Sequence, residues 1–446
     1  MSHALPIRHT LKPVKGTLLD KIRTRKARVG VIGLGYVGLP LVVEFAKAGL
    51  ETVGFDINTD KVKQIARGES YISDVSPEEV RAVTRSGHLT ATTDFSLLAT
   101  TDTVNICVPT PLRKTKDPDL SYVVSAVDEI AKYLHPGQLI ILESTTYPGT
   151  VDEVVQPKLE ANGLRAGTDF FLAFSPERVD PGNAEWTTRN IPKVVGGIDE
   201  TSTRLAAALY EQIVETVVPV SSTRVAEMVK LLENTFRAVN IGLVNELALM
   251  CRDLNIDVWE VIDAAKTKPF GFMSFYPGPG LGGHCIPIDP FYLSWKARQT
   301  GFESRLIEVA GHVNAGMPRH VVDRVAEALN SRSRAIRDSR VHLLGVAYKS
   351  NVGDVRESPA LDIVQLLQRQ GAVVGYSDPF VPSVCQGMLD LKAVPVEQAL
   401  AEGIDCAVIT THHRGVNYAA IVERALVVVD TRNVLKGVDA DNIFRL

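Results

Sequence analysis

The feature that most limits what this chain can fold into is a strand–loop–helix–strand unit near its beginning. The unit contains a short apolar strand, Arg28–Ile32, the loop Gly33-Leu34-Gly35-Tyr36-Val37-Gly38, a helical pattern through Ala48, and a second strand, Glu51–Phe55, ending at Asp56. A GxGxxG sequence alone is weak evidence. With these elements in this order and at this spacing, the sequence predicts a dinucleotide-binding Rossmann unit.

Each glycine of this loop has its own expected role. Gly33 permits the tight turn, Gly35 lets a pyrophosphate approach, and Gly38 packs the helix against the strand. The helix N-terminus supplies free N–H groups and positive potential for phosphates. Asp56 is expected to bind a ribose 2′-hydroxyl and to repel a 2′-phosphate, which favours NAD over NADP. The alternative is that the glycines only form turns and Asp56 only caps a strand end.

Polar loops follow the later strands of the same region. Strands are predicted at Thr103–Val108, Leu139–Leu142, Phe170–Phe174 and Lys193–Val195, and the loops are Pro109-Thr110-Pro111, Glu143–Gly149 and Ser175–Arg178. Ligands of a doubly wound sheet bind beyond the carboxyl ends of its strands, so these loops suit a nicotinamide and a sugar. Taken singly, each threonine is equally typical of a turn or a helix cap.

Composition and charge exclude several other classes of protein. The length of 446 residues predicts two or three globular domains. The net charge of −4 gives no sign of a nucleic-acid or membrane partner, and we expect none. The five cysteines lie far apart, so we expect reduced thiols in a cytoplasmic protein. The sequence has no 18-residue apolar run and no signal peptide. The first 28 residues hold eight Lys and Arg against Asp20 alone, and we expect a solvated, partly mobile lead-in.

A long helix is predicted over Thr223–Asn255. Its apolar positions have helical spacing, and we interpret them as ordinary core: Val225, Met228, Val229, Leu232, Phe236, Val239, Leu243, Leu247 and Met250. Lys230 and Asn234 share a face roughly opposite this stripe, and Asn245 lies near it. This polar face is either a solvated surface or, in a helix between two domains, the wall of a cleft.

A cysteine in an unusual setting follows this helix. After a shorter helix, Val258–Thr267, a Gly- and Pro-rich segment leads to Gly282-Gly283-His284-Cys285. Two glycines let backbone or ligand approach closely, so the thiol can face a substrate. A thiol beside a nicotinamide permits two oxidations, because it can hold an aldehyde as a thiohemiacetal and then as a thioester. Asp289-Pro290 resembles an N-cap with proline at the first helical position, which places Cys285 near a helix N-terminus that favours thiolate.

A second α/β pattern begins after Ser331. Strands are predicted at Arg340–Leu344, Val373–Tyr376, Asp405–Thr410 and Leu426–Val429, with a helix at Ala360–Arg369 and no second GxGxxG. The loops carry Tyr348-Lys349 and Asp354–Ser358, and Arg432 follows the last strand. A tyrosine can stack on a base, while Lys and Arg pair with phosphates, so this region suits a nucleotide diphosphate. Each of these residues is equally typical of a surface or of packing.

Taken together, these motifs resemble the nucleotide-sugar 6-dehydrogenase family over Arg28 to Arg445. The resemblance rests on five motifs: the glycine loop continued through Leu39-Pro40, Glu143-Ser144-Thr145, Ser175-Pro176-Glu177-Arg178, Gly282-Gly283-His284-Cys285, and Ala347-Tyr348-Lys349 with Asp354-Val355-Arg356-Glu357-Ser358. The family oxidises C6 of a UDP-sugar to a carboxylate with two NAD molecules. The resemblance implies two Rossmann-like doubly wound α/β domains joined by a central helical domain with a long helix.

The resemblance also implies roles for individual residues. Cys285 is the nucleophile, Lys230 the base or oxyanion stabiliser aided by Asn234, Asp289 supports the thiol and hydrolysis, and Thr145 and Glu177 position water. The implied NAD contacts are Gly33, Gly35, Tyr36, Val37, Gly38, Asp56, Lys61, Thr110 and Thr145. The implied substrate contacts, with no metal, are Glu177, Arg178, Lys230, Asn234, Tyr276, Gly282, Tyr348, Lys349 and Arg432.

Two departures point to one branch of the family. UDP-glucose dehydrogenases commonly have a lysine where Ile288 stands and a glutamate where Pro181 stands. The segments 284–290 and 178–183 instead resemble the bacterial UDP-N-acetylglucosamine 6-dehydrogenases of O-antigen and capsule pathways. We therefore expect UDP-N-acetylglucosaminuronate as the product. UDP-N-acetylmannosamine or UDP-glucose as substrate, a single-oxidation hydroxyacid dehydrogenase, and a nucleotide-sensing binding module are the alternatives.

We expect the chain to be organised in four parts. We also expect it to form a homodimer or a higher homo-oligomer. Residues 1–27 form a basic extension, 28–218 an NAD-binding Rossmann domain, 219–330 a central helical domain with the cysteine, and 331–446 a UDP-sugar-binding Rossmann-like domain.

Overall fold

The structure is a computed structural model that describes residues 18–72, 74–113, 117–180, 183, 185–387 and 389–446. The chain folds into two compact units. The first unit holds the described residues up to Arg113 and from Pro118 to Lys230, and the second holds Asp117 and the described residues from Leu231 to Leu446.

The first unit is built on one sheet with the strand order β3-β2-β1-β4-β5-β6-β7-β8. The strands are β1 (Arg28–Ile32), β2 (Glu51–Phe55), β3 (Leu89–Thr92), β4 (Thr103–Ile106), β5 (Leu139–Leu142), β6 (Phe171–Phe174), β7 (Lys193–Gly197) and β8 (Val217–Pro219). Neighbouring strands are parallel except β6 and β7, which pair antiparallel. The first six strands have the order of a dinucleotide-binding sheet.

Helices cover both faces of this sheet. They are α2 (Gly38–Lys47), α3 (Thr59–Ala66), α4 (Pro77–Arg85), α5 (Ser121–Tyr133), α6 (Gln156–Glu160) and α7 (Glu200–Tyr210), with short turns of helix at Phe95–Thr100 and Val151–Val155. One core lies between the sheet and α2 and α7, and a second between the sheet and α5 and α6. Because both faces are covered, central strands such as β5 are apolar at every position.

The expectation of a solvated lead-in is wrong for the part of the N-terminal segment that the structure describes. Leu18–Arg23 forms helix α1, and Leu18 and Ile22 are buried in the core of the first unit. Lys21 pairs with Asp102 at 2.6 Å. The apolar residues between the basic ones therefore decide the structure here, while residues 1–17 lie outside the described part.

The second unit contains a helical region and a second sheet. The helices α9 (Val258–Ala265), α10 (Asp289–Gln299) and α11 (Arg305–Asn330) precede a parallel sheet in the order β10-β9-β13-β14-β15. Its strands are β9 (Arg340–Leu344), β10 (Val373–Ser377), β13 (Cys406–Ile409), β14 (Val427–Asp430) and β15 (Ile443–Arg445). Numbered within the unit, this order is 2-1-3-4-5, another common doubly wound order. The predicted fold class is confirmed, although α11 was not predicted.

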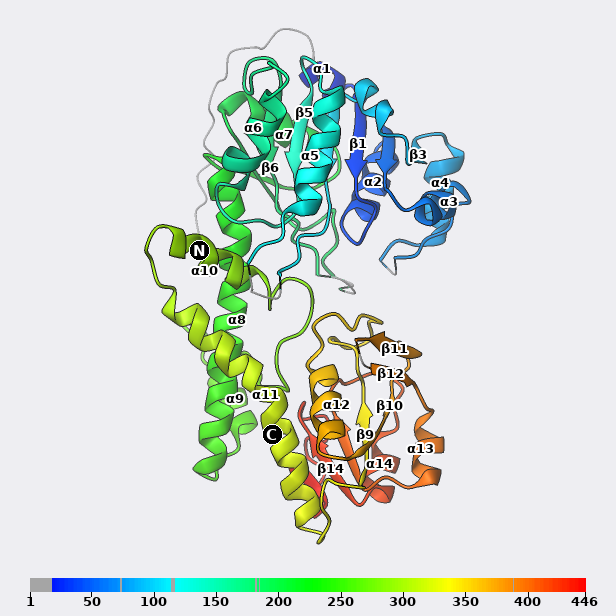
Figure 1. Ribbon diagram of the computed structural model, residues 1–446, viewed down its shortest axis with the longest axis vertical. Helices are drawn as coiled ribbons and strands as arrows, with labels where there is room; N and C mark the ends of the chain where they lie inside the picture. The colour runs from blue at the N-terminus through cyan, green and yellow to red at the C-terminus, as the bar shows by residue number, and fades with distance from the viewer. Residues whose placement is uncertain (1–17, 73, 114–116, 181–182, 184, 388) are drawn as a thin grey trace. The chain divides into compact units, whose positions relative to one another are not determined.

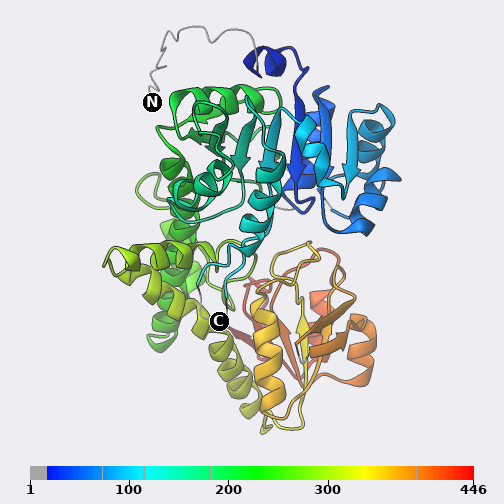
Figure 2. The ribbon, with the colours of Figure 1, turned by 45° about the horizontal axis from the view of Figure 1, so that its top comes forward.

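The second sheet also has a core on each face. Helices α11 and α12 (Pro359–Arg369) pack on one face, and α13 (Val396–Glu402) and α14 (Tyr418–Arg424) on the other (Figures 1 and 2). A small hairpin of β11 (Ser383–Gln386) and β12 (Leu389–Lys392) completes this part.

Helix α8 (Thr223–Asp253) corrects one expectation and decides against one of two alternatives. Most of its apolar stripe is not core, because Leu232, Phe236, Leu243 and Met250 are 46 to 58% exposed in the single chain, although Val229 packs on the core of the first unit. Its polar face is not a solvated surface, because Lys230, Asn234 and Asn245 are buried. Periodicity finds the two faces of a helix but not which one is covered. None of the described helices, α8 included, is long and apolar enough to cross a membrane.

Candidate functional site

The glycine loop has the geometry that a bound dinucleotide requires. Gly33 has a φ of +90°, and a Cβ there would stand 2.6 Å from the carbonyl oxygen of Cys107. A Cβ at Gly38 would stand 1.9 Å from the carbonyl oxygen of Gly33, whereas a Cβ at Gly35 would meet nothing within 4 Å. Gly33 and Gly38 thus close the turn, and the space over Gly35 suits a pyrophosphate at the N-terminus of α2.

Asp56 closes this loop from the end of β2. Its Oδ2 accepts hydrogen bonds from the backbone N–H of Leu34 (2.9 Å) and from Lys61 Nζ (3.2 Å), and its Oδ1 accepts from the N–H of Asn58 (2.9 Å). The carboxylate therefore lies beside the glycine loop, where an NAD ribose is expected. Two of the predicted NAD contacts, Lys61 and Asp56, therefore pair with each other in this structure.

We expect Asp56→Ala to weaken NAD use roughly tenfold or more and to relax the discrimination against NADP, because both the ribose hydrogen bonds and the repulsion of a 2′-phosphate are lost. The measurement is the ratio of kcat/KM for NAD and NADP. Asp60→Ala, an exposed aspartate on α3, is the matched control. An unchanged ratio in Asp56→Ala would exclude this role for Asp56.

The loops that follow β4 and β5 lie together. Ser144 Oγ donates to the carbonyl oxygen of Val108 (2.7 Å), which joins the loop of Thr110 to the loop of Thr145. Thr110 is buried and Thr145 half-buried. Elsewhere in the first unit, a cavity of about 450 Å³ has Tyr36, Val37 and Glu177 among its lining residues. Several of the predicted site residues are thus brought together by the first sheet.

Glu177 is held by a buried ion-pair cluster. Its Oε1 accepts from the backbone N–H groups of Arg178 and Val179 (both 2.7 Å), and its Oε2 accepts from Lys193 Nζ (3.1 Å). Lys193 also donates to Glu143 Oε2 at 2.7 Å. Burial by itself would raise the pKa of Glu177, but Lys193, the backbone N–H of Val179 and the charge of Lys230 lower it overall, so this carboxylate is ionised at neutral pH.

Lys230 is a buried cation. Its side chain is 8% exposed, and no hydrogen bond or ion pair joins it to any residue that the structure describes. One turn earlier on α8, Glu227 accepts from the backbone N–H groups of Gly149 (2.6 Å) and Val151 (3.0 Å). Burial raises the pKa of Glu227 to about 8, while these N–H groups oppose the shift. Glu227 ties α8 to the loop after β5, and a buried ammonium such as that of Lys230 is unusual unless a ligand meets it.

The polar face of α8 anchors both ends of the cysteine segment. Asn234 Nδ2 donates to Asp289 Oδ2 at 2.6 Å, and Asn245 Oδ1 accepts from the backbone N–H of Gly278 at 3.0 Å. The expected N-cap role of Asp289 is wrong: α10 begins at Asp289, its N-cap is Ile288, and no side-chain cap is formed. The carboxylate of Asp289 accepts a hydrogen bond from Asn234 instead.

Cys285 is half-buried between these anchors. The backbone N–H groups of Ile288 and Asp289 donate to its carbonyl oxygen (3.0 and 2.8 Å), so the thiol lies one turn before α10. The glycines before it make room for Tyr348 in this structure. A Cβ at Gly282 would stand 2.6 Å from Tyr348 Cβ, and one at Gly283 would stand 2.9 Å from its ring. The cysteine segment and the Tyr348 loop are thus packed directly on each other.

Arg432 is a half-buried cation beside the same segment. A Cβ at Gly278 would stand 2.5 Å from its Nη1, and its Nε donates to the carbonyl oxygen of Thr410 at 2.9 Å. Burial lowers the pKa of Arg432 to about 10, and no carboxylate among the described residues pairs with it. This environment suits an anionic ligand.

Other predicted substrate residues make contacts within the chain. Tyr276 donates to Asp263 at 2.9 Å and stacks on Trp259, and Arg178 Nη1 donates to the carbonyl oxygen of Pro192 at 2.7 Å. Lys349 is half-buried in the loop after β9. Ile288 is half-buried at the N-terminus of α10, whereas Pro181 lies outside the described residues.

Four polar residues that support the site were not predicted as site residues: Glu143, Lys193, Glu227 and Asn245. Glu143 and Lys193 each adjoin an apolar strand, and such a charge beside a buried strand is a usable signal. Glu227 and Asn245 share the helix face of Lys230, so extending that face along α8 would have found them.

Comparison with known proteins agrees with this geometry. Residues 27–214, 224–316 and 342–437 match the NAD binding domain, central domain and UDP binding domain of the UDP-glucose/GDP-mannose dehydrogenase family. The chain is 35% identical to the UDP-N-acetyl-D-mannosamine dehydrogenase of Pyrococcus horikoshii, over 94% of this chain and 98% of that one. It is 39% identical to the UDP-N-acetyl-D-glucosamine 6-dehydrogenase of Pseudomonas aeruginosa, over 79% and 83% of the two chains.

A solved structure is also similar. That of the Pyrococcus horikoshii UDP-D-ManNAc dehydrogenase matches with a TM-score of 0.86 at 36% identity, over 94% of this chain and 98% of that one. With an NAD-type glycine loop in one unit and a thiol segment packed on a second Rossmann-like sheet in the other, the chain belongs to the UDP-glucose/GDP-mannose dehydrogenase family and is an NAD-dependent UDP-sugar dehydrogenase.

Proposed function

We propose that this enzyme oxidises C6 of UDP-N-acetylglucosamine to the carboxylate, a four-electron oxidation that yields UDP-N-acetylglucosaminuronate. The observation that carries the proposal is the Asn234–Asp289 hydrogen bond of 2.6 Å. This bond joins the buried Asp289 carboxylate, at the end of the segment that presents Cys285, to Asn234 of α8. Helix α8 also carries the buried Lys230. A single-oxidation hydroxyacid dehydrogenase needs no such thiol.

The proposed chemistry gives each residue one task. NAD supplies the hydride acceptor for both oxidations, at a site for which the glycine loop and Asp56 are suited. The Cys285 sulfur adds to the C6 aldehyde, its proton passes to the aldehyde oxygen, and a thiohemiacetal results. Loss of a hydride from C6 and of the proton on its oxygen gives a thioester. Water held by Glu177 and Thr145 then forms the new C–O bond, the C–S bond breaks, and a proton of that water passes to the sulfur to restore the thiol.

The remaining residues bind and stabilise. Lys230 stabilises negative charge on the C6 oxygen, with Asn234 beside it on α8. Asp289 orients the thiol segment through Asn234. Tyr348 stacks on the uracil, and Lys349 and Arg432 bind the anionic part of the nucleotide, a role that the lack of a carboxylate partner for Arg432 among the described residues supports.

The choice of sugar rests on the sequence at the cysteine segment. Ile288, where UDP-glucose dehydrogenases commonly have lysine, favours an N-acetylhexosamine. The names of relatives divide between N-acetylglucosamine and N-acetylmannosamine enzymes. UDP-N-acetylmannosamine is therefore the second candidate, and the matches to the family's three domains support the proposed boundaries 28–218, 219–330 and 331–446.

A substrate panel tests the proposal. UDP-N-acetylglucosamine, UDP-N-acetylmannosamine and UDP-glucose are each incubated with NAD, and NADH and uronate are counted per sugar consumed. We expect the highest kcat/KM with UDP-N-acetylglucosamine and two NADH per sugar. A single NADH per sugar would exclude the four-electron reaction, and a preference for another sugar would change only the substrate.

We also propose that the enzyme is a homodimer through the exposed apolar side of α8. Leu232, Phe236, Leu243 and Met250 lie on one side of the helix, and a second copy of the same side would remove them from water. Light scattering should give twice the chain mass, and Leu243→Asp should shift it toward the monomer. None of the five cysteines, all in the described part of the chain, forms a disulfide, which favours the cytoplasm as the compartment of the enzyme.

A further inference from the structure

The second sheet repeats the turn of the NAD-binding unit without its glycine sequence. Gly33 N–H donates to the carbonyl oxygen of Phe55 at 2.8 Å, and Gly345 N–H donates to that of Ser377 at 2.9 Å. Gly345 also has a positive φ, +85°. The strand after each turn is followed by an aspartate, Asp56 in the first sheet and Asp378 in the second. Both sheets therefore place a carboxylate beside the loop that follows their first strand.

The two aspartates have different third partners. Asp378 Oδ2 accepts from the backbone N–H groups of Val346 (2.8 Å) and Ala347 (3.0 Å), much as Asp56 accepts from Leu34. Asp378 Oδ2 also lies 3.1 Å from His413 Nε2, and the two side chains are 0 and 1% exposed. Asp56 pairs with Lys61, which is partly exposed, whereas Asp378 pairs with the buried His413.

His413 has one tautomer in this arrangement. Its Nδ1 accepts a hydrogen bond from the backbone N–H of Asn351 at 3.0 Å, and an N–H group can only donate. Nδ1 therefore carries the lone pair, and Nε2 carries the proton that it donates to Asp378. Burial alone would raise the pKa of Asp378, but His413 and the backbone N–H groups of Ala347 and Phe380 lower it, so the acceptor is ionised.

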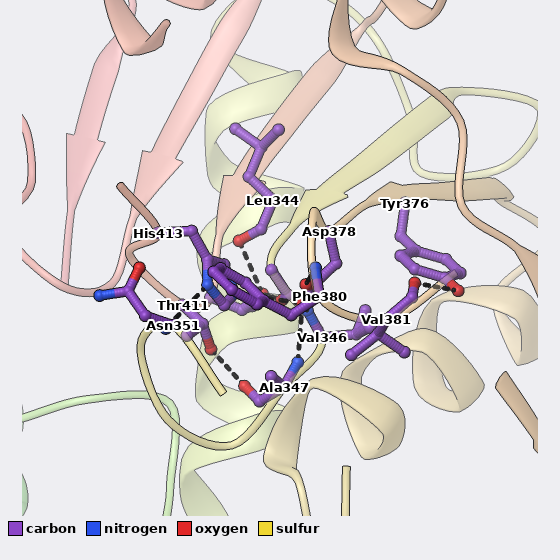
Figure 3. Close-up of polar contacts among 12 residues, drawn as sticks. Leu344, Val346, Ala347, Asn351, Tyr376, Asp378, Phe380, Val381, Thr411 and His413 are labelled. Atoms are coloured by element: carbon purple, nitrogen blue, oxygen red, sulfur yellow. Dashed lines mark hydrogen bonds and ion pairs between the residues drawn. The ribbon is translucent and has the colours of Figure 1, made fainter. Parts of the chain in front are cut away.

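These contacts hold both ends of the segment Val346–Asn351, the first part of the loop after β9 (Figure 3). At the beginning of this segment, Ala347 N–H donates to Asp378, and the carbonyl oxygen of Ala347 accepts from Thr411 Oγ1 at 2.6 Å. At its end, Asn351 N–H donates to His413. Tyr348 and Lys349 lie between the two anchors. The loop borders the gap between β9 and β13, where the strand order of this sheet reverses and ligands of such folds bind.

We propose that His413, bridging Asp378 and Asn351, is a positioning residue that fixes the loop of Tyr348 and Lys349 in its nucleotide-binding conformation. The inference rests on the proposed function in one respect, namely that this loop binds the UDP part of the substrate. An ordered loop does not lose conformational freedom when the ligand arrives, so its affinity is higher. Release of either anchor should therefore weaken substrate binding without affecting the NAD site.

His413→Ala tests this with steady-state kinetics and with calorimetric titration of UDP into the full-length enzyme. We expect the KM for the UDP-sugar and the Kd for UDP to rise roughly 10- to 100-fold, as for a lost buried hydrogen bond. The KM for NAD and the kcat at saturating sugar should stay within about twofold of wild type. His412→Ala is the matched control, because this neighbouring histidine is exposed.

His413→Lys keeps the proposal testable if the alanine variant does not fold. Lysine can retain a donor to Asp378 but has no acceptor for Asn351 N–H, so the KM for the UDP-sugar should still rise. A wild-type KM in His413→Lys, or equal increases in the two KM values in His413→Ala, would overturn the positioning role. Tyr348→Ala tests the proposed function separately: if it leaves UDP binding intact, the assignment of the loop is wrong whatever His413 does.

Discussion

A Cys285→Ser variant is expected to bind NAD normally and to release no uronate in sustained turnover. The cofactor loop lies in the first unit and the thiol in the second, so the substitution leaves the NAD-binding residues unchanged. A serine hydroxyl with a high pKa is a poor nucleophile toward the aldehyde, and an ester is resolved less readily than a thioester. The first oxidation needs no nucleophile, so limited NADH or a retained aldehyde is expected.

The measurement counts NADH and uronate per UDP-sugar, with mass spectrometry of wild-type enzyme quenched during turnover to find the substrate-linked cysteine. Cys385→Ser is the matched control, because Cys385 is exposed on β11. It should leave both oxidations intact. Wild-type rates of uronate formation by Cys285→Ser would exclude the covalent mechanism.

Lys230→Ala is expected to lower kcat by roughly 100-fold or more, the usual effect of losing an acid–base or oxyanion group. The structure strengthens this expectation, since the ammonium is buried with no hydrogen bond or ion pair to a described residue, and its charge helps to lower the pKa of Glu177. Its removal breaks no ion pair seen there, so the fold should survive and the unfolding temperature should not fall.

The measurement is kcat at saturating NAD and UDP-sugar, with thermal unfolding of the same preparation. Arg237→Ala is the matched control, because it removes an exposed cation from the same helix. A folded Lys230→Ala enzyme with near-normal kcat would show that burial of this cation serves another purpose than catalysis.

Local rules were sufficient for the central strands of both sheets, whereas the edge strands β3, β8 and β15 and the hairpin of β11 and β12 were not predicted. The first βαβ unit was predicted because its turn imposes requirements on neighbouring residues. It needs a residue with a positive φ (Gly33), a residue that allows close packing (Gly38) and an acceptor at the end of the second strand (Asp56). Strands of the second sheet were found for a similar reason. Both sheets are covered on two faces, so central strands such as β5 and β13 are continuous apolar runs.

Side-chain partners far apart in the sequence were not predicted. Asp289-Pro290 has the sequence of a helix cap, but its carboxylate binds Asn234, 55 positions earlier. His413 is paired with Asp378 and Asn351 across three loops, and no local pattern marks it. Lys193 joins Glu143 and Glu177 only because the sheet places their strands side by side.

The sequence by itself determined the family of the fold, the cofactor loop and the presence of a thiol after two glycines, because each depends on short-range backbone geometry. Only the tertiary structure decided which side of α8 is buried. An apolar stripe and a polar face are equally compatible with a 31-residue helix. The structure buries the polar face, where Asn234 and Asn245 find hydrogen-bond partners, and leaves the apolar stripe exposed. Burying an amide without a hydrogen-bond partner costs more free energy than leaving a leucine in water. Which face of α8 is buried therefore depends on the groups that the rest of the chain places against the helix.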